Sequence, residues 1–343
     1  RGAAASRVVL GKEVQEDTPV SSIDFIWQEP SSATVERLEA LAQRAFSIDE
    51  AQPFSEQTLV EARKWSRGES SAVRILEVCE AGETRGFAAL VTDGDSCLLE
   101  AAVDPSARER GLGTALITEA LTRVDGEVAA WVHGGPDASS SAMISAQKLA
   151  KSQGFVAQRE LFKMGLALTD ETRASILAAA EAAPLPADIT LETYTEKDAG
   201  GWVEANATAF ADHPEQGKLT LKDLEERAGS DWFRAEGFFL AKDGTGSIAG
   251  SHWTKIPHHQ TGVLEGEVYA VGVTPDWQGK GLGRSLTLAG MAYLAQTDYA
   301  PGKKLDRIVL YVDAENSPAV TLYRSLGFSP LTIDRQYLAT TER

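Results

Sequence analysis

Arg108–Gly113 reads RERGLG and Gln278–Gly283 reads QGKGLG, so one short pattern occurs twice, 170 positions apart. Each copy follows an apolar run that ends in a proline, and each precedes a stretch whose apolar residues have helical spacing. Gly154-Phe155 and Gly327-Phe328, which are 173 positions apart, extend the correspondence downstream. Repetition at about half the length of a 343-residue chain predicts two equivalent domains.

The order of patterns is the same in both halves. Each half reads as two helices, antiparallel strands, a long strand, the glycine turn with its helix, and then a strand, a helix and a last strand. This order predicts an α/β fold in which each domain has a mixed, mostly antiparallel sheet flanked by helices. An Ala-rich helical stretch that runs into Pro184 and Pro186 marks the boundary, because proline cannot continue a helix. The predicted organisation is an N-terminal extension (1–20), an N-terminal domain (21–168), a helical linker (169–188) and a C-terminal domain (189–343).

The chain is strongly acidic, with 33 Lys and Arg against 50 Asp and Glu and a formal net charge of −17. Nucleic acids and anionic membranes are bound by basic surfaces, so we expect neither as a partner. A small substrate that carries an amine fits this charge better. No run approaches the roughly 20 apolar residues of a membrane span, and the first residues do not resemble an export signal. These features predict a cytoplasmic protein, which we expect to be a monomer.

The sequence contains two cysteines, Cys79 and Cys97, and five histidines. Both cysteines lie in apolar, strand-like surroundings, which favours buried free thiols in a reducing compartment. A disulfide between neighbouring strands is the alternative. The cysteines and histidines do not have the spacing of metal ligands, so we expect no metal.

A glycine turn between a strand and a helix is suited to binding phosphate. Glycines at two of its positions leave several backbone N–H groups uncovered at the positive end of the helix dipole. Arg108, Arg110, Lys280 and Arg284 add local positive charge at the two turns. The alternative is a tight strand-to-helix turn that binds nothing. Neither copy is a P-loop or a dinucleotide fingerprint, because the residues that define those motifs are missing.

The two glycine turns and the sequences around them resemble those of a known family. The pattern Q/R-x-x-G-x-G after a strand resembles the pyrophosphate-binding turn of the GNAT superfamily of acetyl-CoA-dependent N-acetyltransferases. In the second half, HPEQGKLTLKDLEER, SHWTKIP, GEVYAVGVTPDWQGKGLGRSLTLAGMAYL and LYVDAENSPAVTLYRSLGF resemble the mycothiol synthase family, the tandem acetyltransferases of actinobacteria. The first half resembles that family through IDEAQPFSEQTL and ARERGLG. The resemblance implies acetyl-CoA as the acetyl donor.

By this resemblance, acetyl-CoA contacts fall on the glycine turn, on the strand before it and on the start of the last helix. In the second half they are Val271, Gly272, Val273, Gln278, Gly279, Lys280, Gly281, Leu282, Gly283, Arg284, Asn316, Ser317, Pro318, Ala319, Val320 and Thr321. In the first half they are Ala101, Ala102, Val103, Arg108, Glu109, Arg110, Gly111, Leu112 and Gly113. The alternative for Asn316 and Ser317 is an ordinary helix start.

Acetyl transfer to an amine needs a base for the amine and an acid for the departing thiolate. Glu267 lies on the strand before the second turn, near the expected thioester end of the cofactor. Strand alternation would place its side chain on one face with those of Tyr269, Val271 and Val273. We expect Glu267 to act as the base, through water, and Tyr323 on the last helix to act as the acid. The alternatives are a solvent-facing glutamate and a tyrosine that only packs and hydrogen-bonds locally.

The repeat indicates which half performs the chemistry. Counted back from the first turn and from Gly154, Cys97 stands in the place of Glu267 and Ala150 in the place of Tyr323. The first domain therefore lacks both proton-transfer groups but keeps its phosphate turn. We expect it to bind acetyl-CoA without catalysis, and we assign catalysis to the second domain.

The substrate of the family is a cysteinyl glucosaminyl inositol, which carries a primary amine, a thiol and many hydroxyls. By the resemblance, its contacts fall on Asp49, Glu215, Lys255, Glu267 and Tyr311. Tyr311 could instead be a core residue, because Trp131 takes its place in the first half. Asp49 could be a solvated loop acid.

We therefore expect an N-acetyltransferase that acetylates the cysteinyl amine of this substrate, desacetylmycothiol, to give mycothiol and CoA. Two alternatives stay open. One is a GNAT enzyme for another small amine, such as an aminoglycoside or a polyamine. The other is an acetyl-CoA-sensing module without turnover.

Overall fold

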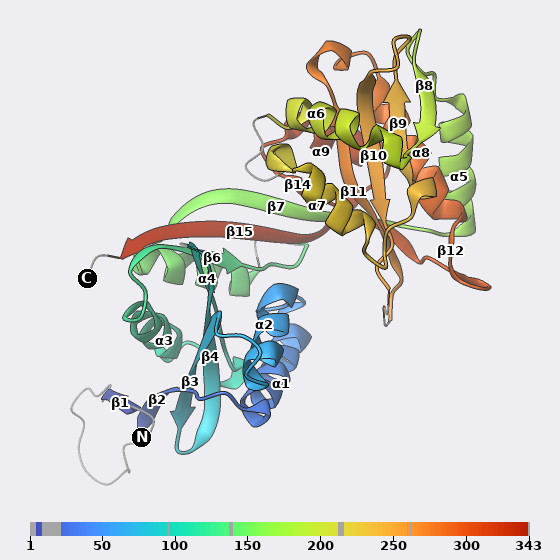
Figure 1. Ribbon diagram of the computed structural model, residues 1–343. Coiled ribbons are helices and arrows are strands. Elements are labelled where there is room, and N and C mark those ends of the chain that lie inside the picture. Colours follow the sequence, from blue (N-terminus) through green and yellow to red (C-terminus); the bar gives the residue numbers. More distant parts are fainter. Residues whose placement is uncertain are drawn as a thin grey trace. The chain divides into compact units, whose positions relative to one another are not determined.

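A computed structural model describes residues 5–8, 22–94, 96–136, 140–211, 216–258, 260 and 262–341 (Figure 1). The chain forms two compact units. Unit 1 contains the residues up to Phe162, Asp313–Glu315 and the segment from Leu331 onward, whereas unit 2 contains Lys163–Val312 and Asn316–Pro330. Within the described ranges, no helix is long and apolar enough to cross a bilayer.

The sheet of unit 1 has the strand order β1-β2-β3-β4-β5-β6. Strands β5 and β6 are parallel and the other neighbours are antiparallel. The elements of the first half are β1 (Ala5–Val8), β2 (Ile23–Trp27), α1 (Ser32–Asp49), α2 (Glu56–Ser66), β3 (Val73–Glu80), β4 (Glu83–Asp93), β5 (Ser96–Val103), α3 (Leu112–Leu121), β6 (Gly126–Val132), α4 (Ser141–Ser152) and β7 (Val156–Ala167).

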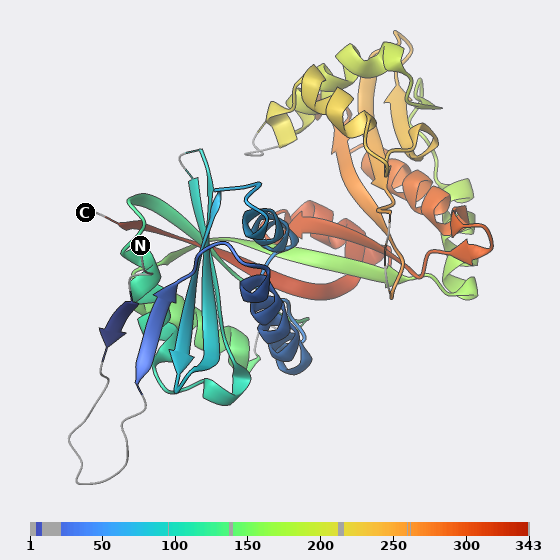
Figure 2. The same cartoon turned by 60° about the horizontal axis from the view of Figure 1, so that its bottom comes forward.

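The core of unit 1 follows the two-residue period of its strands. Along β4, Phe87 and Ala89 pack with residues of α1 and α2, whereas Ala88 and Leu90 pack with residues of α3. Helices α1 and α2 therefore cover one face of the sheet and α3 covers the other (Figure 2).

Unit 2 repeats this arrangement with the strand order β14-β11-β10-β9-β8. Strands β11 and β14 are parallel, and the other neighbours are antiparallel. The elements of the second half are α5 (Asp170–Ala182), β8 (Thr190–Thr193), α6 (Ala199–Ala209), α7 (Leu221–Ala228), β9 (Phe238–Lys242), β10 (Ile248–Lys255), β11 (Glu265–Val273), α8 (Leu282–Gln296), β12 (Asp298–Ala300), β13 (Lys303–Lys304), β14 (Arg307–Asp313), α9 (Ser317–Ser325) and β15 (Ser329–Thr341).

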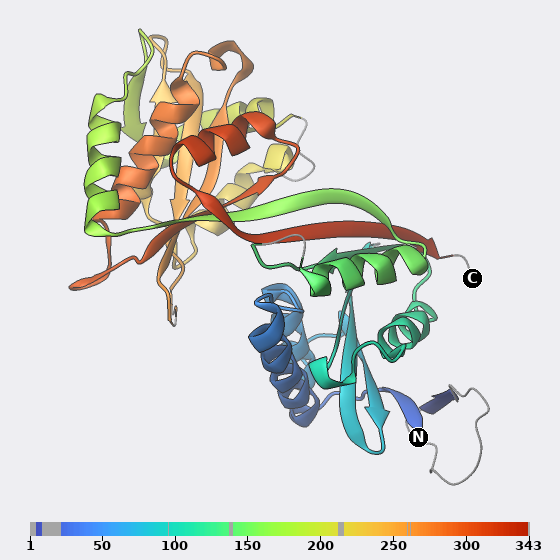
Figure 3. The ribbon, with the colours of Figure 1, turned by 180° about the vertical axis from the view of Figure 1, so that it is seen from behind.

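The two faces of the second sheet also carry different helices. Trp202 of α6 and Leu224 of α7 pack with Leu240 and Trp253 on one face. Leu286 of α8 belongs to the cluster on the other face, where α5 lies against α8 (Figure 3). The prediction of mixed sheets flanked by helices is confirmed in both units.

Strand β15 is divided between the two units, which the sequence did not predict. The last part of β15 pairs antiparallel with β6, from Arg335 opposite Val132 to Thr341 opposite Gly126, and so belongs to unit 1. Helix α5, which the sequence suggested as a linker, lies in unit 2. The two units are defined by which residues pack together, not by where the repeated sequences begin and end. The boundaries at 21–168, 169–188 and 189–343 therefore stay a prediction.

Candidate active site

The second glycine turn joins β11 to the long helix α8. Gly281 is the N-cap of α8 and has φ +83°, and Gly279 has φ +72°, so both take the left-handed conformation that glycine adopts at no steric cost. A Cβ at either position would meet no atom within 4 Å. Within the described residues, the backbone N–H groups of 279–283 have no hydrogen-bond acceptor. The turn therefore presents several open donors.

The first turn has the same shape. Gly111 is the N-cap of α3 with φ +81°, and Glu109 has φ +61°. In each turn the first residue of the pattern donates from its side chain to the end of the preceding strand, with Arg108 Nε 3.1 Å from the Val103 carbonyl oxygen and Gln278 Nε2 3.0 Å from that of Val273. Arg108 and Gln278 thus hold the turn against its strand.

The charge at the two turns differs. Both terminal nitrogens of Arg108 lie 2.7 Å from the Asp49 carboxylate, and Arg110 is paired with Glu80. The positive charge predicted for the first turn is therefore compensated, and Asp49 is bound within unit 1 rather than solvated.

At the second turn the cations stay uncompensated. Lys280 Nζ lies 4.5 Å from the centroid of the Trp277 ring, and Arg284 donates to the Ser325 hydroxyl at 3.1 Å. Among the described residues, no carboxylate lies within 4 Å of Lys280 or Arg284. Open N–H groups at a helix start with two such cations fit the diphosphate of acetyl-CoA.

Glu267 lies on β11 and is largely buried, with its side chain 15% exposed, so the solvent-facing alternative is wrong. It stands opposite Lys255 in the β10–β11 register, and Lys255 Nζ lies 3.9 Å from Glu267 Oε2. Burial raises the pKa of the Glu267 carboxyl above its usual value, and the charges of Lys255 and Lys163 oppose that rise. A carboxylate in such surroundings is suited to accept a proton near neutral pH.

A bulge in β11 changes the expected alternation. The register passes from Trp253 opposite Ala270 to Thr254 opposite Val268, so Tyr269 is an extra residue. Tyr269 consequently packs in the cluster of α6 and α7, whereas Val271 and Val273 pack in the cluster of α8. The prediction that Glu267, Tyr269, Val271 and Val273 share one face is wrong for this reason.

The same bulge corrects the comparison between the two halves. Glu267 pairs with Lys255 on β10 and with Val309 on β14, whereas in unit 1 the residue in that register is Leu98, opposite Val91 and Ala129. Leu98, rather than Cys97, is therefore the counterpart of Glu267. The first unit has no carboxylate at this position with either residue. Cys79 and Cys97 are both free thiols.

Tyr323 lies on α9 and is 9% exposed, with its ring 6.0 Å from that of Phe328. Phe328 N donates to the Tyr323 carbonyl as Phe155 N donates to that of Ala150, which confirms Ala150 as the counterpart. Burial raises the pKa of the Tyr323 hydroxyl to about 12. Within the described ranges this hydroxyl makes no hydrogen bond, so local hydrogen bonding does not explain the tyrosine.

The remaining predicted substrate and cofactor residues have different surroundings. Tyr311 on β14 is 50% exposed, so the core alternative is wrong, and Lys163 Nζ lies 5.9 Å from its ring centroid. Asn316 is the N-cap of α9 and accepts from Ala319 N at 3.3 Å, as a helix start would. Glu215 lies outside the described residues.

Unit 1 has a buried charged cluster that the sequence analysis missed. His133, just after β6, lies with Nε2 3.1 Å from Glu100 Oε1 and Nδ1 3.2 Å from Asp334 Oδ1. The two carboxylates outweigh burial and raise the pKa of His133 to about 9, so the imidazole is a cation at neutral pH. Glu100 also accepts from Ser55 N at 2.9 Å, at the N-cap of α2. No local pattern marks these residues, because they come from distant segments.

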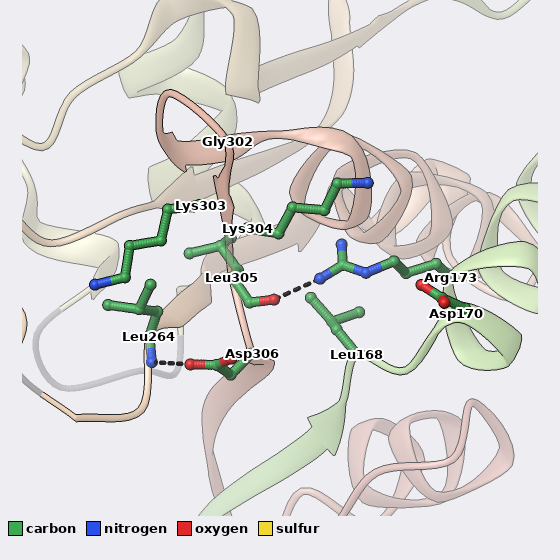
Figure 4. Close-up of a pocket in the computed structure, with 9 residues that line it drawn as sticks. All are labelled: Leu168, Asp170, Arg173, Leu264, Gly302, Lys303, Lys304, Leu305 and Asp306. Atoms are coloured by element: carbon green, nitrogen blue, oxygen red, sulfur yellow. Dashed lines mark hydrogen bonds between the residues drawn. The ribbon is translucent and has the colours of Figure 1, made fainter.

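A cavity of about 460 Å³ opens in unit 2, lined by Leu168, Asp170, Arg173, Leu264, Gly302, Lys303, Lys304, Leu305 and Asp306 (Figure 4). Arg173 donates to the carbonyls of Ala295 and Leu305, and Asp306 accepts from Leu264 N at 2.8 Å. None of the predicted site residues lines it. Because its buried polar groups are already paired, this cavity does not replace the site around Glu267.

Comparison with known proteins finds one family twice in the chain. The profile of the "Acetyltransferase (GNAT) family" matches residues 35–155 and 204–328. A mycothiol acetyltransferase of Rothia mucilaginosa is 41% identical over 327 residues, which cover 91% of this chain and 92% of the relative. A mycothiol acetyltransferase of Thermobifida fusca is 40% identical over 317 residues, covering 87% of this chain and 92% of the relative.

Solved structures resemble the fold. A tandem GNAT protein from the clavulanic acid biosynthesis pathway aligns with TM-score 0.63 and 18% identity, covering 92% of this chain and 98% of that one. A GCN5-related N-acetyltransferase from Sphaerobacter thermophilus aligns with TM-score 0.61 and 21% identity, covering 93% and 98%. These likenesses support the tandem architecture.

Proposed function

The chain belongs to the acetyltransferase (GNAT) family and, within it, to the mycothiol acetyltransferases, and from this premise we propose that it acetylates desacetylmycothiol with acetyl-CoA. The acceptor is the cysteinyl amine of a cysteinyl glucosaminyl inositol, and the products are mycothiol and CoA. The observation that carries this proposal is the match to mycothiol acetyltransferases over 91% of the chain.

Acetyl-CoA, when bound, supplies the acetyl group as a thioester. In the second unit it would be held by the turn Gln278–Arg284, by the backbone of Val271–Val273 and by the start of α9, Asn316–Thr321. The open N–H groups of the turn and the uncompensated cations support this assignment. We propose that the first turn, Arg108–Gly113 with Ala101–Val103 before it, also binds acetyl-CoA but takes no part in the reaction.

Glu267 is the base of the proposed reaction. An acceptor amine is largely protonated near neutral pH, since an α-amino group has a pKa of about 7.7 to 8.0. Glu267, acting through water, takes the proton and leaves the nitrogen lone pair free to attack the acetyl carbon. The burial of this carboxylate supports the role, because burial makes it a stronger base than an exposed glutamate.

Tyr323 is the acid. As the carbon–sulfur bond breaks, its hydroxyl would give a proton to the sulfur, and the second proton of the nitrogen would pass through water to the phenolate of Tyr323. The amide and the thiol then leave as neutral products. The raised pKa keeps this hydroxyl protonated throughout the neutral range. Lys255, Tyr311, Glu215 and Asp49 are the proposed contacts of the amine and sugar groups of the substrate.

The proposal also covers the cellular compartment, the oligomeric state and the need for a metal. Free thiols at Cys79 and Cys97 suit a reducing compartment, so we propose a cytoplasmic enzyme that works as a monomer without a metal. Size-exclusion chromatography with light scattering tests the monomer, and activity after exhaustive chelation tests metal independence.

The decisive experiment compares acceptors. Purified protein is incubated with acetyl-CoA and, separately, with the cysteinyl glucosaminyl inositol, the glucosaminyl inositol without cysteine, an aminoglycoside and a polyamine. Products are quantified by mass spectrometry, because the thiol of the substrate would disturb thiol-based assays. We expect kcat/KM for the cysteinyl compound to exceed that of every other amine by at least about 100-fold, which corresponds to roughly 3 kcal/mol.

Either alternative would be recognised in the same assay. An aminoglycoside or a polyamine with the highest kcat/KM would replace the substrate. Tight acetyl-CoA binding without acetylation of any amine would indicate a sensing module.

A further inference from the structure

Two aromatic rings surround the ammonium of Lys255 in unit 2. Lys255 Nζ lies 5.3 Å from the centroid of the Trp232 ring and 5.4 Å from that of the Tyr269 ring. The two rings are themselves neighbours, with centroids 5.2 Å apart. A cation within about 6 Å of an aromatic face is attracted by the ring quadrupole. Trp232 and Tyr269 therefore hold the end of a long, otherwise flexible side chain.

Tyr269, the extra residue of the bulge in β11, provides one of these rings. As the extra residue opposite Trp253 and Thr254, Tyr269 packs on the same face as Trp232. Its hydroxyl accepts from Arg227 Nε at 3.1 Å, which fixes the ring from the side of α7.

The other charges near Glu267 are paired among themselves. Lys163 Nζ lies 2.8 Å from Glu265 Oε2, and Arg307 lies 2.7 Å from Glu265 Oε1. On α7, Arg227 lies 3.9 Å from Asp223. The neighbouring strand β14 also carries Tyr311, which is half exposed.

Lys255 is in a different position from these cations. Within the described part of the chain, Glu267 is its one carboxylate neighbour inside 4 Å, at 3.9 Å. Lys255 is thus the cation most directly placed to favour the ionised form of Glu267. The pKa of the Glu267 carboxyl reflects this, since the charge of Lys255 is the first of the effects that oppose its rise on burial.

We propose that Trp232 is a positioning residue which, together with Tyr269, holds the Lys255 ammonium beside the Glu267 carboxylate and so keeps that carboxylate ionised and ready to accept a proton. Trp232 acts through Lys255 and does not touch the reacting atoms. The proposal rests on the proposed function for its consequence in catalysis. The placement of Lys255 is a property of the protein alone and can be measured without substrate.

The test is a titration of Glu267 in the full-length protein labelled with ¹³C at glutamate carboxyl carbons. The resonance that is absent from Glu267→Gln is assigned to Glu267. In Lys255→Met we expect the titration midpoint of Glu267 to rise by about 1 pH unit or more, and in Trp232→Leu by at least about 0.5. Trp232→Phe keeps a ring beside the ammonium, so we expect it to restore most of the shift.

A matched control separates the loss of the aromatic contact from a general loss of packing. In unit 1, Arg123 Cζ lies 5.3 Å from the centroid of the Trp27 ring, the same distance as in the Lys255–Trp232 pair. Trp27→Leu should leave the Glu267 midpoint within about 0.2 pH units. A folded Trp232→Leu protein with an unshifted midpoint overturns the proposal, and so does a Trp232→Phe protein that is shifted as far as Trp232→Leu.

Kinetics then link the placement to the reaction. The acidic limb of the kcat/KM profile should move upward in Trp232→Leu by the same amount as the titration, with little change in the KM for acetyl-CoA. If desacetylmycothiol is not acetylated by the unmodified protein, the proposed function fails, while the titration still decides the role of Trp232.

Discussion

Glu100 Oε1 lies 3.1 Å from His133 Nε2, and the pair stands where the two parallel strands of unit 1 separate. The last residues in register are Leu99 and Ala130, so Glu100 is the first residue of β5 beyond the paired segment. Asp334 holds the other ring nitrogen of His133. A charged cluster thus lies where β5 and β6 separate, and it should make unit 1 sensitive to alkali.

We expect His133 to stabilise unit 1 most below neutral pH. Its pKa is about 9 in the folded protein and about 6.5 when unfolded, so the stabilisation is complete below about pH 6.5 and is lost as the pH rises through 9. Between pH 7 and 9 one proton accounts for about 1.4 kcal/mol of unfolding free energy per pH unit. Urea unfolding of the protein and of His133→Gln at a series of pH values measures this, and equal slopes in both would refute the prediction.

His252 should act in the opposite direction. It is fully buried, its Nδ1 donates to the Leu286 carbonyl at 2.7 Å, and burial lowers its pKa to about 4. A lowered pKa means stabilisation that is complete above about pH 6.5 and is lost as the pH falls toward 4. We expect His252→Gln to reduce the acid dependence of unfolding between pH 6.5 and 4.5 by about one proton. The same slope in the variant would exclude His252 as its source.

Glu267→Gln should lower kcat by at least about tenfold and leave the Kd of acetyl-CoA nearly unchanged, because the amide cannot take the proton of the amine. Stopped-time product analysis and isothermal titration calorimetry measure the two quantities. Glu192→Gln serves as the control, since Glu192 is half exposed and paired with Lys242 away from β11. Unaltered turnover in Glu267→Gln would remove it as the base.

Tyr323→Phe removes one hydroxyl from a buried ring and should lower kcat by about 10² or more. Because this hydroxyl makes no hydrogen bond with the described residues, we expect the melting temperature to change little. Tyr194→Phe is a matched control, as Tyr194 is 8% exposed and packs on Phe238 in the same unit. If both variants lose activity equally, the effect comes from packing and Tyr323 is not the acid.

Gly281→Ala should weaken acetyl-CoA binding. The substitution forces an alanine into φ +83°, at a cost of about 1–2 kcal/mol, and shifts the N–H groups of the turn. Gly246 has φ +84° and equally open surroundings in the loop before β10, so Gly246→Ala should lose the same stability. We expect only Gly281→Ala to raise the KM for acetyl-CoA several-fold. An equal rise in both variants would contradict a role for the turn.

The sequence predicted the features that depend on residues close together in the chain. A left-handed glycine at a helix start is visible in the sequence, and its recurrence after 170 positions marks two similar sheets. The positions of Glu267 on β11 and of Tyr323 on α9 also agree with the sequence.

Irregular and long-range features escaped prediction for physical reasons. Counting residues does not detect a bulge, so the extra Tyr269 displaced the comparison from Leu98 to Cys97. Glu100 and His133 are 33 positions apart, and Asp334 follows 201 positions after His133, so no periodicity connects them. The contact of Lys255 with Trp232 was missed as well, because the two residues come from different elements and no periodicity connects them.

The pairing of β15 with β6 has a consequence for synthesis. When a ribosome has completed β6, the strand that pairs with it has not yet been translated, because Arg335 follows Val132 by 203 positions. The edge of β6 that pairs with β15 therefore stays unpaired until nearly the whole of unit 2 has been translated. Unit 1 can therefore complete its sheet only after unit 2 has been synthesised. A truncation shortly after Pro330 would remove the part of β15 that pairs with β6, and so would destabilise unit 1.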